Sequence, residues 1–329
     1  MAATIKDIAK MTGLGYATIS AYLNGVNVRP KNKEAIENAI AKLGYVRNEY
    51  ARGLKTRKTM TIGVLIPELN NAFSTTIISE MEDVLRQNGY GVIICDCKTD
   101  LELEKKSLRF LISKMVDGLV IMPIATDGKI VDMATSQNIP TVVIDRITDN
   151  RSDSYIVINN QQVSHDAVAK LIEKGHKKIA IITGDNDIYT ARERTNGYKL
   201  ALQNNNCFDP NFVYDGGLSI DGGYLAMKDI IINNVDVTAL FVTNYEMTIG
   251  AIIAINEFGK KIPKDYSFIG FDNQQLSRIF TPKLATVNQP LIEIGRSAAN
   301  KIIDIINGEP RETIELNAQL CEGESIVRL

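Results

Sequence analysis

The chain has 329 residues, of which 45% are hydrophobic and 23% are charged, so we expect a folded protein with more than one domain. Four cysteines and two histidines argue against a disulfide framework and against a histidine-rich metal site. No apolar run approaches the roughly 18 residues that span a bilayer, and the N-terminus shows no secretory signal. We therefore expect a cytoplasmic protein with no membrane contact.

The net charge of −2 is unevenly distributed along the chain. Residues 1–58 contain 11 Lys and Arg against four Asp and Glu, whereas the remaining residues carry a net charge of −9. A small basic segment joined to a large acidic one indicates that the basic segment binds a polyanion. A basic tail of no functional consequence is the alternative.

Three short helices are predicted within the first 45 residues. Thr4 can cap the first one, with Asp7 three positions later, and the stretch 12–15 (TGLG) ends it. The second helix is expected at about 16–23 and the third at about 31–43. This layout is typical of a helix-turn-helix module, whose second helix enters the DNA major groove, although such a module can also bind protein.

The segment 47–58 is basic and joins this module to the rest of the chain. Asn48 can cap a helix of about two turns, which is too short to be stable alone in water. Leu54 is an apolar residue among cations and is suited to opening a base step in the minor groove. An ordinary flexible linker is the alternative.

From residue 60 onward, apolar strands alternate with helices. The strands are predicted at about 61–67, 91–96, 118–123, 141–145, 156–158, 178–183, 239–243 and 267–271. The helices are predicted at about 73–88, 101–114, 128–137, 161–174, 190–204, 222–233 and 245–258. This alternation predicts an α/β protein with two doubly wound parallel-sheet lobes and a ligand crevice at the carboxyl ends of the strands.

We therefore expect three parts in the chain: a helix-turn-helix domain at 1–46, a hinge helix at 47–58 and a core at 59–329. Lobe one of the core should contain about 59–159 and 290–318, and lobe two about 160–289 and 319–329. Segments near 284–289 and 312–329 are expected to cross between the lobes.

Signatures of enzymes are absent from the sequence, which contains no GxGxxG, Walker A, GxSxG or HExxH motif. His176 is interpreted as a structural connector, and Cys95 and Cys97 as core thiols. Glu102 and Glu104 are interpreted as parts of a helix start and a solvated helix face. We therefore predict no catalytic residues, no metal and no cofactor.

Eight stretches, in order and over nearly the whole length, follow one known pattern: 4–25 (TIKDIAKMTGLGYATISAYLNG), 42–73, 116–123, 139–146, 173–184, 194–202, 262–273 and 281–295. Through them the chain resembles the lac repressor family of bacterial transcription regulators. The resemblance implies a core like that of periplasmic binding proteins. It also implies a homodimer, or a dimer of dimers, on near-palindromic operator DNA, with a small effector between the lobes, most often a sugar or sugar phosphate.

The resemblance also implies roles for single positions. Tyr16, Ala17 and Ala21 match base-reading positions. The other expected DNA contacts are Thr4, Thr18, Ser20, Asn24, Asn48, Ala51 and Leu54, the last three in the hinge helix. The positions expected to contact the effector are Phe73, Ser74, Arg146, Thr190, Arg194, Leu218, Asn244 and Asp272.

The chain departs from the family pattern at several of these places. Ala21 stands where a cation is usual, and Arg47 stands where a proline usually precedes the hinge helix. The stretch 71–74 (NAFS) lacks a second aromatic residue, which argues against a stacked purine and for a polyol. Tyr245 replaces a carboxylate that often contacts ligand, so the identity of the effector does not carry over.

We therefore expect a sequence-specific DNA-binding regulator, specifically a repressor of a carbohydrate operon. A small sugar or sugar-phosphate effector in the cleft between the lobes is expected to relieve the repression. Two alternatives stay open. One is a corepressor-dependent regulator that responds to a nucleobase or another metabolite, and the other is a solute-binding protein without DNA function. The end of the chain shows no heptad extension, which favours a dimer over a tetramer.

Overall fold

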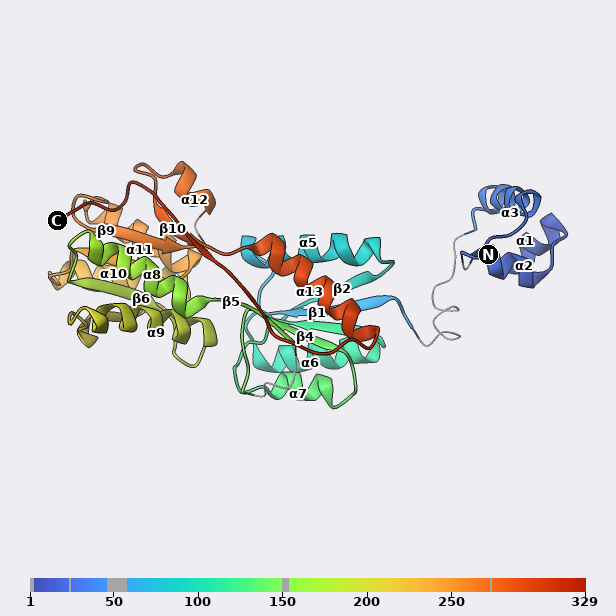
Figure 1. Ribbon diagram of the computed structural model, residues 1–329, viewed down its shortest axis with the longest axis horizontal. Helices are drawn as coiled ribbons and strands as arrows, with labels where there is room; N and C mark the ends of the chain where they lie inside the picture. The colour runs from blue at the N-terminus through green and yellow to red at the C-terminus, as the bar shows by residue number, and fades with distance from the viewer. Residues whose placement is uncertain (1–2, 24, 46–57, 150–153, 273) are drawn as a thin grey trace. The chain divides into compact units, whose positions relative to one another are not determined.

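The computed structural model describes residues 3–23, 25–45, 58–149, 154–272 and 274–329 (Figure 1). The chain divides into two compact units, Met1–Thr59 and Met60–Leu329. Four of the expected DNA contacts, at Asn24, Asn48, Ala51 and Leu54, lie outside the described residues, as does nearly all of the expected hinge helix.

The first unit contains three helices, α1 (Ile5–Thr12), α2 (Tyr16–Leu23) and α3 (Pro30–Leu43). The backbone nitrogen and the hydroxyl of Thr4 both donate to Asp7 Oδ2, at 2.8 and 2.7 Å, so the predicted cap of the first helix is confirmed. Gly13 ends this helix in the left-handed region, at φ 70°. Ile8, Ile19 and Ile36 are fully buried and form the centre of the unit.

Lobe one is built on a six-stranded parallel sheet in the order β11-β5-β4-β3-β1-β2. Its strands are β1 (Thr61–Ile66), β2 (Gly91–Asp96), β3 (Gly118–Ile121), β4 (Thr141–Ile144), β5 (Ser154–Ile158) and β11 (Ile314–Leu316). Helices α5 (Ala72–Gln87) and α13 (Leu291–Ile306) pack on one face, and α6 (Leu101–Ser113) and α7 (Lys129–Thr135) on the other. The strands β1, β3, β4 and β5 are thus buried on both faces, whereas the edge strand β2 is partly exposed.

Lobe two is built on the sheet β12-β10-β9-β8-β6-β7, in which only β12 runs antiparallel to its neighbour among the described strands. Its strands are β6 (Ile179–Thr183), β7 (Val213–Asp215), β8 (Ala239–Val242), β9 (Ser267–Phe271), β10 (Ala285–Asn288) and β12 (Gln319–Cys321). Helices α8 (Asn160–Glu173) and α9 (Tyr189–Asn204) cover one face, and α10 (Ile220–Ile232) and α11 (Tyr245–Glu257) the other. The short helices η1 (Pro210–Phe212) and α12 (Gln274–Ile279) lie in connections.

Three segments of the described chain cross between the lobes, from β5 to α8, from β10 to α13 and from β11 to β12 (Figure 1). Two of them are hydrogen-bonded to each other at Asn159, whose Oδ1 accepts from the nitrogen of Ala318 at 2.8 Å and whose nitrogen donates to the carbonyl of Leu316 at 3.1 Å. The expected crossing at 284–289 needs correction, because β10 belongs to the lobe-two sheet and the chain crosses only after it.

The interpretation of Glu104 is wrong. Its side chain is only 3% exposed, and its Oε1 accepts a hydrogen bond from the nitrogen of Ile124 at 2.9 Å. The carboxylate therefore holds the loop after β3 instead of facing solvent. The structural reading of His176 is confirmed, since its ring nitrogens bond to Thr238 Oγ1 at 2.9 Å and to the carbonyl of Val327 at 3.0 Å. No helix among the described residues is long and apolar enough to cross a bilayer.

Candidate functional site

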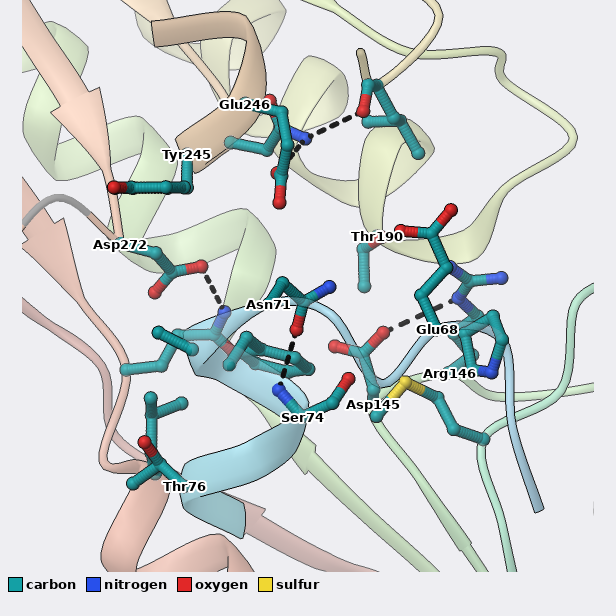
Figure 2. A pocket seen from close by; sticks show the side chains of 18 of the residues that line it. Glu68, Asn71, Ser74, Thr76, Asp145, Arg146, Thr190, Tyr245, Glu246 and Asp272 are labelled. Atoms are coloured by element: carbon teal, nitrogen blue, oxygen red, sulfur yellow. Dashed lines mark hydrogen bonds and ion pairs between the residues drawn. The ribbon is translucent and has the colours of Figure 1, made fainter. Parts of the chain in front are cut away.

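A cavity of about 880 Å³ lies in the core, lined by residues of both lobes (Figure 2). Lobe one contributes the loops after β1, β3 and β4, and lobe two those after β6, β7, β8 and β9. These are carboxyl ends of parallel strands, where open α/β sheets bind ligands. All eight positions expected to contact an effector line this one cavity, namely Phe73, Ser74, Arg146, Thr190, Arg194, Leu218, Asn244 and Asp272. Their contact with an effector stays a prediction.

Arg194, in α9, is the most tightly held of these side chains and is only 5% exposed. Its Nε donates to Asn160 Oδ1 at 2.8 Å and its Nη1 to the carbonyl of Thr243 at 2.7 Å. The guanidinium lies 3.7 Å from the centre of the Phe271 ring. Burial lowers the pKa of Arg194, and the negative charges of Asp272 and Asp145 oppose that shift. The cation is therefore fixed in place by protein groups.

Asp272 follows β9 with a left-handed backbone, at φ 60°. Its Oδ2 accepts a hydrogen bond from Gln289 Nε2 at 2.7 Å. Burial raises the pKa of Asp272 to about 6, even though the nearby Arg194 and the bond from Gln289 lower it. The pKa of this carboxyl group therefore lies just below neutral pH.

Arg146 follows β4 and is anchored to lobe one. Its Nη1 donates to the carbonyls of Pro123 and Ile124, both at 2.8 Å, and its Nε lies 3.4 Å from Asp145 Oδ2. Glu104 lies close enough for the charge of Arg146 to lower its pKa, although burial raises that pKa more strongly. Glu104 itself is not part of the described lining and acts on the cavity through the nitrogen of Ile124, which lines it.

Two helices begin at the cavity with asparagine caps. Asn71 Oδ1 accepts from the nitrogen of Ser74 at the start of α5, and Asn244 Oδ1 accepts from the nitrogen of Met247 at the start of α11, both at 2.8 Å. Asn244 Nδ2 also donates to Glu246 Oε2 at 2.9 Å. Asn244 therefore orients both the helix and the neighbouring carboxylate.

Several residues that line the cavity were missed by sequence analysis. They are chiefly Glu68, Asn71, Thr76, Asp145, Glu246, Gln275, Gln289 and Glu293. Tyr245, noted above for its place at a position that often contacts ligand, also lines the cavity. Burial raises the pKa of Glu246, and the charge of Glu68, which comes from the other lobe, raises it further. Glu68 and Glu246 follow β1 and β8 within a few residues, so the rule that ligands bind at carboxyl ends of strands could have found both.

In the first unit, α2 exposes part of the surface expected to read DNA. Tyr16 is 54% exposed and Ala17 is exposed, whereas Thr18, Ser20 and Ala21 are half-buried. The hydroxyl of Thr4 is engaged with Asp7, which places Thr4 in the helix cap. Contact of these residues with DNA stays a prediction.

Comparisons with protein families match both units. The model for bacterial regulatory proteins of the lacI family matches residues 4–48. The model for periplasmic binding proteins and the sugar-binding domain of the LacI family matches residues 59–322. Together they cover most of the chain.

Individual relatives agree with these matches. The HTH-type transcriptional regulator RegA of Clostridium acetobutylicum is 37% identical over 333 residues, with 99% of each chain covered. The HTH-type transcriptional repressor PurR of Histophilus somni is 34% identical over 332 residues, which cover 99% of this chain and 100% of the relative.

Solved structures are similar over the same length. The lac repressor dimer bound to operator and the anti-inducer ONPF has a TM-score of 0.90 at 25% identity, covering 99% of this chain and 100% of that one. The CelR–cellobiose complex has a TM-score of 0.76 at 28% identity, covering 98% and 99%. A LacI-family regulator from Enterococcus faecium with bound ribose has a TM-score of 0.74 at 27% identity, covering 82% and 99%.

The helix-turn-helix unit, the two parallel-sheet lobes and these relatives agree with one another. The chain belongs to the LacI family of bacterial regulatory proteins and is a DNA-binding transcriptional regulator.

Proposed function

We propose that this regulator represses a carbohydrate-utilisation operon and that a small sugar, bound in the cavity between the lobes, relieves the repression. The lining of the cavity carries this proposal. Phe73, Leu218 and Leu291 offer apolar walls against which the faces of a sugar ring can pack, and carboxylates and amides between them can bond hydroxyl groups. The solved complexes of CelR with cellobiose and of the Enterococcus faecium regulator with ribose support a sugar as effector.

The proposed mechanism couples the two units of the chain. A homodimer places two copies of α2 about one DNA turn apart, in successive major grooves of a near-palindromic operator. Tyr16, Ala17 and Ala21 contact bases, while Thr18 and Ser20 fix the register on the backbone. A sugar that binds better to the free form than to the operator-bound form shifts the population away from DNA.

A gel-shift titration with the promoter fragment of the regulator's own gene tests the proposal. We expect specific retardation that weakens when the cognate sugar is added. A ligand that tightens operator binding would make the protein corepressor-dependent and contradict the proposed sign of regulation. Failure to retard the fragment at low salt would contradict operator binding itself.

Substitution of Tyr16 tests the assignment of α2. We expect Tyr16→Ala to weaken binding to the operator about tenfold, because one base contact is worth about 1–3 kcal/mol, while binding to random DNA stays the same. Tyr22→Phe is the matched control, since Tyr22 lies on the same helix and its hydroxyl donates to Glu37 at 2.8 Å within the unit. An equal loss on operator and random DNA would remove Tyr16 from the base-reading surface.

A further inference from the structure

The cavity is rich in negative charge. Its described lining includes five carboxylate side chains, and its only cations are Arg146 and Arg194, without any Lys or His. The carboxylates are those of Glu68, Asp145, Glu246, Asp272 and Glu293. An anionic ligand would therefore enter a field that repels it.

Both arginines are already engaged by the protein. Two of the three guanidinium nitrogens of Arg194 donate to Asn160 and Thr243, and its face is covered by Phe271. Arg146 Nη1 donates to two backbone carbonyls. Strong recognition of a phosphate uses two parallel hydrogen bonds from one guanidinium group. The contacts of Arg194 and Arg146 with the protein occupy several of the N–H groups that such recognition would need.

Helix ends could in principle favour an anion, because α5, α10 and α11 all begin at the cavity and the positive end of a helix attracts negative charge. The protein already occupies one first-turn nitrogen of each of these helices. Asn71, Ser219 and Asn244 accept bonds from the first-turn nitrogens of α5, α10 and α11. Glu246 and Glu293 add carboxylates to the first turns of α11 and α13.

Glu68 and Glu246 face the cavity from opposite lobes (Figure 2). The charge of Glu68 raises the pKa of Glu246, so the two carboxylates are close enough to repel each other. Hydroxyl groups of a ligand would donate bonds to these oxygens, and an amine would neutralise them. A phosphate would instead add a third negative group to the same space.

We infer that the cavity selects a sugar or polyol without negative charge, either neutral or amine-bearing, and excludes phosphorylated sugars and other anions. Glu68 and Glu246 determine this specificity. The inference rests on the effector site proposed above and narrows the class of effector that this site takes.

Calorimetric titration of the full chain tests the inference with matched probes. The neutral probes are glucose, ribose and cellobiose, the amine probe is glucosamine, and the anions are glucose 6-phosphate, ribose 5-phosphate and inorganic phosphate, all at constant ionic strength. We expect at least one neutral or amine probe to bind, and each phosphate ester to bind at least tenfold more weakly than its parent sugar. A phosphate ester that binds as tightly as its parent would overturn the inference, and so would binding of none of the neutral and amine probes.

Variants identify the residues that are responsible. For the double variant Glu68→Gln and Glu246→Gln, we expect the ratio of the Kd of a phosphate ester to that of its parent to fall at least threefold. The control is Glu309→Gln, an exposed residue three positions beyond the far end of α13, for which the ratio should not change. If this ratio of Kd values is unchanged in the double variant, Glu68 and Glu246 do not determine the selectivity of the cavity against anions.

Calorimetry and gel shifts on the same purified chain distinguish failure of this inference from failure of the proposed function. If the chain retards its promoter fragment but binds a phosphate ester tightly, the inference fails and the regulatory function stands. If a neutral sugar binds in preference to its ester but the chain retards no DNA, the charge selectivity stands and the proposed function fails.

Discussion

Arg194 shows how one side chain can serve both folding and ligand response. Its bonds to Asn160 and Thr243 and its position over Phe271 hold it at the wall of the cavity. The negative charges of Asp272 and Asp145 counter only part of the loss of its hydration, because burial still lowers the pKa of Arg194. Removing this cation therefore affects several buried polar groups at once.

We expect Arg194→Ala to lose the response to effector and to lower the free energy of unfolding by about 3–5 kcal/mol, because it leaves the buried charge and acceptors around it unpaired. Urea denaturation and gel-shift titration with effector measure both effects. Arg194→Lys keeps a charge with fewer donors and should fold while losing part of the response. Arg192→Ala, a partly exposed arginine on the same helix that pairs with Glu193 at 3.5 Å, should change stability by less than about 1 kcal/mol. A normal response in the alanine variant would exclude Arg194 from the site.

Asp272 makes the stability of the core depend on pH. Its pKa of about 6 lies above the ordinary value of 3.8, so the folded state holds the proton more tightly than the unfolded state. The contribution of this group to stability is therefore present at low pH and is lost as the pH rises through 6. Between pH 5 and 7 we expect a loss of about 1 kcal/mol relative to Asp272→Asn. Urea denaturation of both proteins over this range measures the difference, and parallel curves would contradict the assignment.

The helices of lobe two pack so closely that some positions admit only glycine. A Cβ atom added at Gly250 in α11 would lie 1.9 Å from the carbonyl oxygen of Ile220 and 2.6 Å from the nitrogen of Tyr224, both in α10. A Cβ atom at Gly223 in α10 would lie 2.4 Å from the carbonyl oxygen of Met247. The two helices are thus in backbone contact, and this contact positions the caps Ser219 and Asn244 at the cavity.

We expect Gly250→Ala to lower the free energy of unfolding by about 2–3 kcal/mol, because backbone atoms cannot yield as a flexible side chain can. It should also weaken effector binding, since α10 and α11 must separate. Ile253→Ala, on the same helix but partly exposed, is the control and should leave effector binding unchanged. Thermal denaturation and titration with the cognate sugar measure both effects. A Gly250→Ala variant with unchanged stability and unchanged sugar binding would contradict the close packing of α10 and α11.

In the part of the core that the structure describes, two lobes are joined by three crossing segments, and the proposed effector site lies where the lobes face each other. A ligand that contacts both lobes favours arrangements in which both sets of contacts form. Such a ligand can change operator binding only through its different affinity for the two states.

The effector should therefore change the affinity for operator by the same factor as the operator changes the affinity for effector. We expect the cognate sugar at about 100 times its Kd to stabilise the protein by about 2.7 kcal/mol. The factor by which it weakens operator binding should equal the factor by which operator weakens sugar binding. Calorimetry with and without operator, beside gel shifts with and without sugar, measures the two factors. Because the two factors must be equal at equilibrium, the test lies in their size, and factors close to one would show that the sugar does not regulate operator binding.

Local sequence patterns predicted much of this molecule. The apolar periodicity located the three helices of the first unit and most helices and strands of the lobes, because each of these elements is long enough to show its period. The strands β7, β10, β11 and β12 and the helices α12 and α13 were missed. Strands of three or four residues show no clear period, whereas α13 has 16 residues and could have been found from its apolar positions. The family pattern placed eight residues at one cavity, because the carboxyl ends of successive parallel strands meet at one edge of a sheet.

The chemistry of the cavity depends on contacts between residues far apart in the chain. Glu104 is 20 residues from the nitrogen that it binds, and Arg194 is 49 residues from the carbonyl of Thr243. The charge of Glu68 acts on Glu246 from the other lobe. Burial and the approach of distant groups set the pKa values and the free hydrogen-bonding capacity of these side chains. Neither is encoded in the spacing of neighbouring residues, because both arise only when the folded chain removes water and brings the groups together.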